Sequence, residues 1–440
     1  MQLLMTPARA ESAHPARAVG WDLAFYLGCF VFALATALAS EFYGYRIWGN
    51  FAVAGYGLAA AHSGWLLISA WRGKQTNGKF GSRWIGIGAV VVIAMCAPLA
   101  MLVVRRLTGT DWLITPFSWA AQPEVWVIEH SADLLLQNGT PYLDFASLHR
   151  APVVNDYTPY GPVMTVFGLP RALFGGTPFL DALTDARWMF ALAAVACAYF
   201  SWRLLNRPHI PVFAAQLAIA CPLTALTWAV AGPDLAIVGL LVLAFALAAS
   251  GRPGWAGLVL ALVISAKLIV APAAAVLAVY VFRRARDGKP WAAAGRFALT
   301  LAATTVVLHL PVYLVNPGAF VEHVIRFPLG MGAVRSPAAS PLPGHLIAQT
   351  GPAGTAISLV LVGIAAVAML VWLARRPPAT GSAALVRTAV GLGALILLTP
   401  ATRYGYLVYP LVLLGAALAF RAAVPTARPP RNGPAPATSS

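Results

Sequence analysis

The chain has 440 residues, of which 60% are hydrophobic and only 10% are charged. Soluble proteins average about 25% charged residues, so this composition cannot cover the surface of a water-soluble protein of this size. The 38 glycines and 34 prolines are spread through apolar stretches without a period, which excludes a collagen-like chain. With a mean hydropathy of +0.75, the sequence predicts an all-α, polytopic integral membrane protein.

The net charge of +16 would suit a nucleic-acid-binding protein, but the distribution of the basic residues does not. They form short clusters between apolar runs, at 72–83, 283–289 and 375–376. Such clusters are typical of loops that stay on the cytoplasmic side of a membrane, so no nucleic acid partner is expected. The four cysteines lie inside apolar runs and predict neither a disulfide framework nor a metal site.

Apolar runs of about 17–25 residues, and some shorter ones, predict about twelve membrane helices. In chain order they cover residues 22–40, 51–71, 84–104, 187–203, 211–230, 233–250, 253–266, 268–282, 296–316, 354–374, 386–400 and 405–421. The seventh and eighth are short and meet at Lys267. Prolines interrupt the run 158–174. We therefore expect it to re-enter the membrane or to lie on it without crossing, where protein covers its free backbone groups.

An even number of spans places both termini on one side, and the basic clusters assign that side to the cytoplasm of a plasma-membrane protein. This assignment requires that 158–174 does not cross. The predicted parts are a cytoplasmic arm (1–21), three helices (22–104), a first outer loop (105–186), central helices (187–316), a second outer loop (317–353), C-terminal helices (354–421) and a disordered cytoplasmic tail (422–440). Most acidic residues then fall on the outer face.

The first outer loop contains a helical pattern between Gln122 and Gly139. Apolar residues recur at the spacing of one helix face: Val125, Ile128, Ala132, Leu135 and Leu136. Asn138-Gly139 is a typical helix end. We therefore expect an amphipathic helix on the membrane surface, with Glu124 in its first turn.

A transporter would carry ionisable residues or broken helices near the middle of the membrane, in two halves related by a repeat. The chain shows no convincing repeat, and Asp234 and Lys267 lie at or near the outer ends of their spans. The polar chemistry gathers at one interface, which favours an enzyme acting there. A transporter or lipid flippase, and a non-catalytic assembly factor, remain as alternatives.

Three segments of the outer loop carry a family resemblance. They are Glu124-Val-Trp-Val, Ala132-Asp-Leu-Leu-Leu-Gln-Asn-Gly-Thr-Pro-Tyr-Leu-Asp144 and Asn155-Asp-Tyr-Thr-Pro-Tyr-Gly-Pro162. Together they resemble the first outer loop of glycosyltransferase family 87, which typically reads Asp-x-x-Val-Tyr, then Gly-x-Pro-Tyr, then Tyr-Pro-Pro. The stretch from Gly257 to Lys267, followed later by Arg283-Arg284, is similar to a helix pair of that family. The resemblance covers roughly residues 105–420.

The resemblance implies the GT-C membrane fold and a polyprenyl-phosphate-dependent hexosyltransferase of actinobacterial cell envelopes. Such an enzyme moves a sugar, expected to be mannose, from the lipid phosphate donor to a lipid or glycan acceptor at the outer face, with inversion. The donor is a substrate, so no cofactor is expected and no divalent metal is indicated.

Such a transfer needs a carboxylate to accept the proton of the attacking hydroxyl. The candidates are Glu124, Asp111 and Asp156. The family has Asp where this chain has Glu124, so the identity of the base stays open. Each acid also has an ordinary structural interpretation, as a helix-terminus, cap or turn residue.

The leaving phosphate needs fixed cations. Candidate donor-phosphate ligands are Lys267, Arg326, Arg335 and Arg403, and candidate sugar or acceptor contacts are Asp234, Tyr157, Tyr160 and Tyr404. The alternatives are snorkelling for the lysine, salt bridges or lipid headgroup contacts for the arginines, a helix cap for the aspartate and interfacial aromatics for the tyrosines.

Overall fold

The computed structural model describes residues 15–423 except 75, 77, 109–119, 286–287 and 329. Within these residues the regular structure is helical. The helices are α1 (Pro15–Ala39), α2 (Tyr43–Trp71), α3 (Trp84–Ala89), α4 (Ala97–Thr108), α6 (Pro123–Asn138), α7 (Pro162–Thr165), α8 (Leu169–Phe174), α9 (Pro178–Leu183), α10 (Ala186–Leu204), α11 (Val212–Ala215), α12 (Pro222–Val230), α13 (Pro233–Ala249), α14 (Pro253–Ala266), α15 (Ala273–Arg284), α16 (Pro290–Val315), α17 (Pro317–Phe320), α18 (Pro343–Ala348), α19 (Pro352–Arg375), α20 (Gly381–Leu398) and α21 (Val408–Ala422).

Nine helical stretches of the described chain are long and apolar enough to cross a membrane: Ala16–Ala39, Tyr43–Trp71, Trp84–Leu107, Pro178–Leu204, Val212–Val230, Pro290–Val315, Pro352–Arg375, Gly381–Leu398 and Tyr404–Ala422. Pro162–Phe174, Pro233–Ala249 and Pro253–Ala266 are shorter apolar helices. An all-α, multispanning membrane protein is therefore confirmed, whereas the count of twelve spans is not.

Several helices begin earlier than predicted. The first helix starts at Pro15 instead of residue 22, the second at Tyr43 instead of 51, and α16 at Pro290 instead of 296. Polar residues at these helix starts, such as Arg46, interrupt an apolar run without interrupting a helix. Hydropathy therefore reports only the apolar middle of each helix.

The run 158–174 forms two short helices, α7 and α8, and Pro162–Phe174 is too short to span a bilayer as one helix. The predicted break at Lys267 is also present. Lys267 has extended backbone angles (φ −152°, ψ 119°) directly after α14, and α15 resumes at Ala273. Pro272 precedes α15, where proline limits a helix on its N-terminal side.

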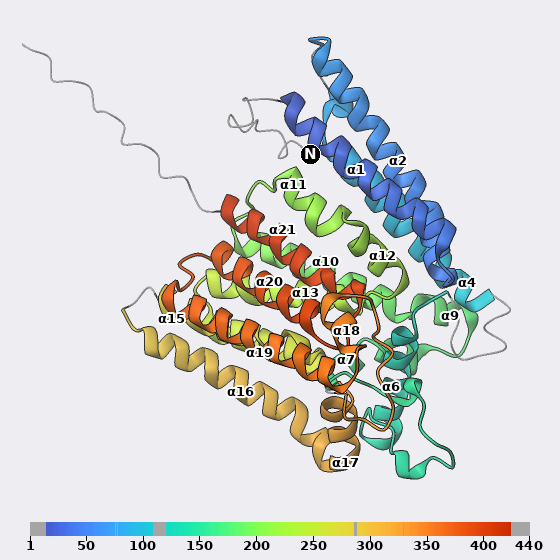
Figure 1. Ribbon diagram of the computed structural model, residues 1–440, viewed down its shortest axis with the longest axis vertical. Helices are drawn as coiled ribbons and strands as arrows, with labels where there is room; N and C mark the ends of the chain where they lie inside the picture. The colour runs from blue at the N-terminus through green and yellow to red at the C-terminus, as the bar shows by residue number, and fades with distance from the viewer. Residues whose placement is uncertain are drawn as a thin grey trace, which may run out of the picture.

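The long helices run across the molecule, and α6, α7, α9, α17 and α18 gather at one end, which we call the loop end (Figure 1). The opposite, basic end carries the C-termini of α2, α15 and α19, where the basic clusters lie. At the basic end Arg83 binds Asp22 through two hydrogen bonds of 2.6 and 2.9 Å. Gln216 donates to the same carboxylate at 2.8 Å.

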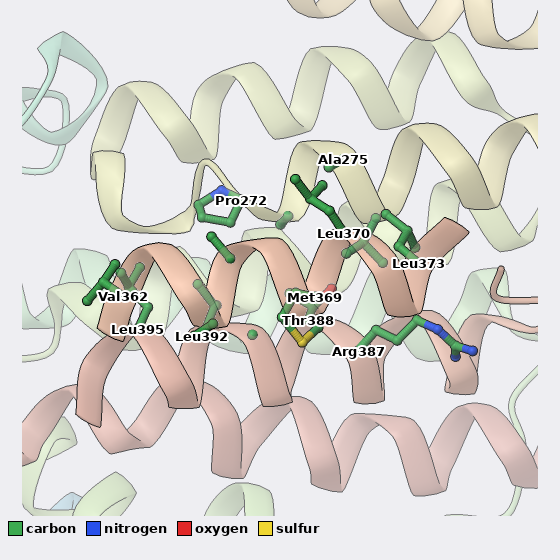
Figure 2. A pocket seen from close by; sticks show the side chains of 15 residues that line it. Pro272, Ala275, Val362, Met369, Leu370, Leu373, Arg387, Thr388, Leu392 and Leu395 are labelled. Atoms are coloured by element: carbon green, nitrogen blue, oxygen red, sulfur yellow. The ribbon is translucent and has the colours of Figure 1, made fainter. Parts of the chain in front are cut away.

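An apolar cavity of about 220 Å³ opens between α15, α19 and α20. Figure 2 shows Val362, Met369, Leu392 and Leu395 around it. Arg387 lies at one margin, with its guanidinium pointing away from these side chains. Because the lining is almost wholly apolar, this cavity has no groups for acid–base chemistry.

Candidate active site

Glu124 and Arg403 form an ion pair at the loop end. Glu124 follows Pro123 in the first turn of α6, where proline fits a helix start and the helix dipole favours a carboxylate. A terminal guanidinium nitrogen of Arg403 donates to Glu124 Oε1. The two side chains are 19% and 31% exposed, so solvent or a substrate can reach the pair.

The predicted second outer loop holds Arg403 in place. Its Ala339 forms an isolated parallel bridge with Thr402. The Thr402 N–H donates to Ala338 O at 3.0 Å, and the Ser340 N–H donates to Thr402 O at 2.9 Å. These backbone hydrogen bonds fix the residue next to Arg403, so segments more than 60 residues apart jointly aim the guanidinium at Glu124.

Lys267 and Asp234 form a second ion pair, with 2.6 Å between Lys267 Nζ and Asp234 Oδ1. The Tyr409 hydroxyl donates to the same oxygen at 2.6 Å. The lysine and aspartate side chains are 12% and 13% exposed. The break after α14 aims Lys267 at the first turn of α13, where Asp234 lies. Each buried charge is thereby compensated, as burial requires.

Electrostatic contacts join the two pairs into one cluster. Lys267 Nζ lies 4.3 Å from the ring centroid of Tyr406 and 5.8 Å from that of Tyr160. The charge of Glu124 acts on both Lys267 and Tyr160. We call Glu124, Arg403, Lys267 and Asp234, with the rings of Tyr160 and Tyr406, the charged cluster.

Two glycines allow the close approaches that shape this cluster. A Cβ on Gly161 would lie 1.9 Å from Ser265 O, so only glycine lets the strap 157–161 pack against the end of α14 beside Lys267. Gly232 has φ +88°, and a Cβ there would lie 2.9 Å from the ring of Phe190. A positive φ favours glycine, and this turn sets the start of α13 and hence the position of Asp234.

The charged cluster holds two carboxylates and two cations, so its net charge is zero before a ligand binds. Within the described chain, no group of three or more His, Cys, Asp or Glu side chains could hold a metal ion. The cluster can accept a proton at a carboxylate and hold an anion with Lys267 and Arg403.

The other predicted bases are not part of this cluster. Asp111 lies outside the described residues. Asp156 accepts hydrogen bonds of 2.6 and 2.7 Å from Arg150, and its carboxylate also binds the N–H of Val153 at 2.7 Å. Arg150 is the main cause of the lowered pKa of Asp156. This environment suits a turn residue.

Of the remaining predicted ligands, only some lie in the charged cluster. Tyr160 belongs to the charged cluster, whereas Tyr404 is exposed and its N–H donates to Ser340 Oγ at 3.0 Å. Tyr157 and Arg326 both contact Glu322 instead. Arg326 pairs with Glu322 at 3.4 Å, and the Tyr157 hydroxyl donates to it at 2.7 Å. Arg335 is exposed, and no hydrogen bond or ion pair among the described residues joins it to the charged cluster.

Sequence reasoning missed a buried charge network beside α6. Arg106 binds Glu129 through hydrogen bonds of 3.0 and 2.6 Å and Asp185 at 2.8 Å. Arg187 binds Asp185 at 2.9 and 3.0 Å. All four residues are buried. The sequence does contain one signal for this network: Arg106 lies at the end of an apolar helix, where a charged side chain needs a partner.

The position of Glu124 is fixed because α6 is held at two points. The buried network binds Glu129 on α6, and Gln122 anchors the start of the helix. Gln122 donates to the hydroxyl of Tyr45, and its own N–H donates to Val230 O at 3.1 Å. Tyr45 and Tyr409 were not predicted as site residues. Both are tyrosines within apolar helices, where sequence alone does not distinguish a packed ring from a hydrogen-bonding one.

Comparison with known proteins places this arrangement in a family. The chain has no significant match among curated proteins and none among solved structures. Residues 157–400, more than half of the chain, match the sequence model of glycosyltransferase family 87. Asp234 and Lys267 lie inside the matched residues, and Glu124 and Arg403 lie outside them. The chain therefore belongs to glycosyltransferase family 87 and is a membrane glycosyltransferase.

Proposed function

We propose that this enzyme transfers a sugar, with mannose the expected one, from a polyprenyl phosphate to a hydroxyl of a lipid or glycan acceptor. The observation that carries the proposal is the charged cluster, in which a carboxylate at a helix start and two cations meet between aromatic rings. A sugar phosphate ester needs those groups: cations for the leaving phosphate and a base for the acceptor.

Lys267 and Arg403 are the proposed ligands of the donor phosphate. Each of these cations is paired with a carboxylate. An arriving phosphate competes for these cations, and movement of Arg403 toward it would release Glu124. Lys267 donates to Asp234, whose carboxylate is also held by the Tyr409 hydroxyl, so the partner of Lys267 is fixed by a second hydrogen bond.

Glu124 is the proposed base. The acceptor oxygen attacks the anomeric carbon as the bond from that carbon to the phosphate oxygen breaks. The hydroxyl proton passes to Glu124, and polyprenyl phosphate leaves with the negative charge held by the cations. One displacement inverts the configuration at the anomeric carbon, and no covalent enzyme intermediate forms.

The proposed reaction takes place at the outer face of the plasma membrane. The charged cluster lies at the loop end, and the basic clusters lie at the opposite end of the helices. The positive-inside rule assigns the basic end to the cytoplasm, together with both termini. An actinobacterial envelope, suggested by the loop motifs, is the expected setting.

The decisive experiment measures sugar transfer by the purified protein in nanodiscs. The donor is polyprenyl phosphate mannose and the acceptors are an actinobacterial lipid extract. Removal of a general base typically lowers rates by about 10²–10⁴-fold, so Glu124→Gln should lose at least about 100-fold in turnover. Lys267→Gln should weaken donor use, and the exposed Glu41→Gln should behave as wild type.

Each outcome separates one part of the proposal. Full activity of Glu124→Gln with loss in Asp111→Asn or Asp156→Asn would assign the base to another acid. Activity with another polyprenyl phosphate sugar would correct the sugar alone. Transport of a lipid sugar across the bilayer, with no transfer from any such donor, would support the transporter interpretation of this fold.

A further inference from the structure

A second hollow of about 360 Å³ lies at the loop end, apart from the charged cluster. Its walls come from residues 143–145 of the first outer loop and from the segment 318–333 that includes the end of α17. Its polar side chains are Asp144, Glu322, His323 and Arg326, and Phe145 supplies an aromatic ring.

Hydrogen bonds hold its central carboxylate in a fixed orientation. The Tyr157 hydroxyl donates to Glu322 Oε1 at 2.7 Å, and the Ala333 N–H donates to the same oxygen at 2.9 Å. Arg326 lies 3.4 Å from Glu322 Oε2, and its side chain is 56% exposed. A carboxylate fixed in this way, with an exposed guanidinium beside it, offers acceptors and donors to a ligand.

His323, which lines the hollow, is neutral, and both of its ring nitrogens form hydrogen bonds. The Thr158 N–H donates to His323 Nδ1 at 3.0 Å, so Nε2 carries the proton and donates to Leu143 O at 2.9 Å. Burial lowers the pKa of His323 to about 4. With both nitrogens engaged in hydrogen bonds, His323 has no free lone pair for a metal ion.

The charges of the hollow indicate the class of ligand. Asp144 and Glu322 against Arg326 give a formal charge of −1, which disfavours a phosphate or another anion. Fixed acceptors, a guanidinium donor and the ring of Phe145 suit a neutral polyol, whose hydroxyls donate and accept and whose C–H face packs on an aromatic ring. A neutral saccharide meets all of these conditions.

The hollow is also close to the charged cluster. Tyr157 borders it, and Tyr160 of the same strap lies beside Lys267. Three residues of extended chain span at most about 11 Å. In addition, the ring of Tyr142 packs beside His323 of the hollow. Its hydroxyl donates to Tyr160 O at 3.0 Å, which links the hollow to the strap that reaches the cluster.

We infer that this hollow is a saccharide-binding subsite, lined by Asp144, Glu322, Arg326 and Phe145, that holds the glycan part of an extended acceptor while the acceptor's reacting hydroxyl lies at the charged cluster. The inference rests on the proposed function for the identity of the acceptor. The binding of a neutral saccharide to the hollow stands independently of it.

Binding is tested without donor, so that a failure of the proposed reaction does not decide the result. The probes are neutral mannose oligosaccharides of two to four units, titrated into the full-length protein in nanodiscs and followed by saturation-transfer NMR. A hydrogen bond to a charged group is worth a factor of about 10 or more, so Asp144→Asn and Arg326→Gln should each weaken binding about tenfold. The exposed Glu41→Gln should bind as wild type.

A transfer assay then tests the subsite in catalysis. For a glycosylated lipid acceptor, Asp144→Asn should raise KM about tenfold with kcat unchanged, and for an acceptor with a single sugar it should change neither. Unchanged thermal unfolding of Asp144→Asn would show that the fold is intact. Equal oligosaccharide binding by wild type and Asp144→Asn, or binding of phosphorylated sugars alone, would overturn the inference.

Discussion

The buried network beside α6 offers a sharp test of how charge stabilises this membrane protein. Arg106 and Glu129 are joined by two hydrogen bonds, of 3.0 and 2.6 Å, and their side chains are 2% and 5% exposed. In Glu129→Gln the remaining carboxylate partner of Arg106 among the described residues is Asp185, which it shares with Arg187. Arg171, 3.5 Å from Glu129 Oε2, keeps Asp181. One positive charge in the network is then left uncompensated.

The magnitude follows from the burial of the pair. Removing one partner of a buried ion pair costs about 3–5 kcal/mol. An unfolding entropy of about 2.1 cal/mol/K per residue gives about 0.9 kcal/mol/K for 440 residues, so Glu129→Gln should lower Tm by about 3–5 °C. Intrinsic fluorescence during heating in nanodiscs measures this change.

A double variant distinguishes charge imbalance from lost packing. Arg106→Met with Glu129→Gln removes both charges, keeps an acceptor for the Ala186 N–H that binds Glu129, and leaves Asp185 with Arg187. It should recover at least half of the lost Tm. Arg150→Gln, in an exposed ion pair, should leave Tm unchanged. A double variant less stable than either single variant would refute the reasoning.

Two further outcomes follow from the structure. Gly161→Ala should lower sugar transfer at least about tenfold with little change in expression, because a Cβ 1.9 Å from Ser265 O displaces the strap that carries Tyr160; Gly88→Ala, with open space around its Cβ, is the matched control, and equal activity of the two would contradict the assigned role of Gly161. Acid should destabilise the protein as pH falls from about 6.5 toward 4, because the unfolded state protonates His323 there and the folded state, with a pKa of about 4, does not. The contribution of His323 is complete above that window, so His323→Asn should reduce the loss of Tm between pH 7 and pH 5; an unchanged loss would mean that other groups cause it.

The fold class was predictable because it depends on composition and on local patterns. Apolar runs separated by basic clusters indicate membrane helices wherever the helices pack. The helix at Pro123–Asn138 and its end at Gly139, in left-handed conformation with φ 71°, were also predicted and are present. Its inward face was only partly predicted: Leu136 is exposed and Leu134 is buried, since α6 is covered by more than one neighbour.

The residues of the charged cluster were predictable one by one, but their pairing was not. Glu124, Lys267, Asp234 and Arg403 each stand out as a charge close to an apolar run. Their partners depend on how α6, α13 and the loop before α21 meet in space. The predicted carboxylate Asp156 illustrates the limit, because Arg150, six residues away, binds it instead.

The sequence by itself determined that this protein is a helical membrane glycosyltransferase, since hydropathy, basic clusters and short motifs are properties of consecutive residues. Only the tertiary structure decided which partner each charge meets: Glu124 with Arg403, Asp234 with Lys267 and Tyr409, and Glu322 with Tyr157. A buried charge must find a partner somewhere, and which one it finds depends on the packing of segments far apart in the chain.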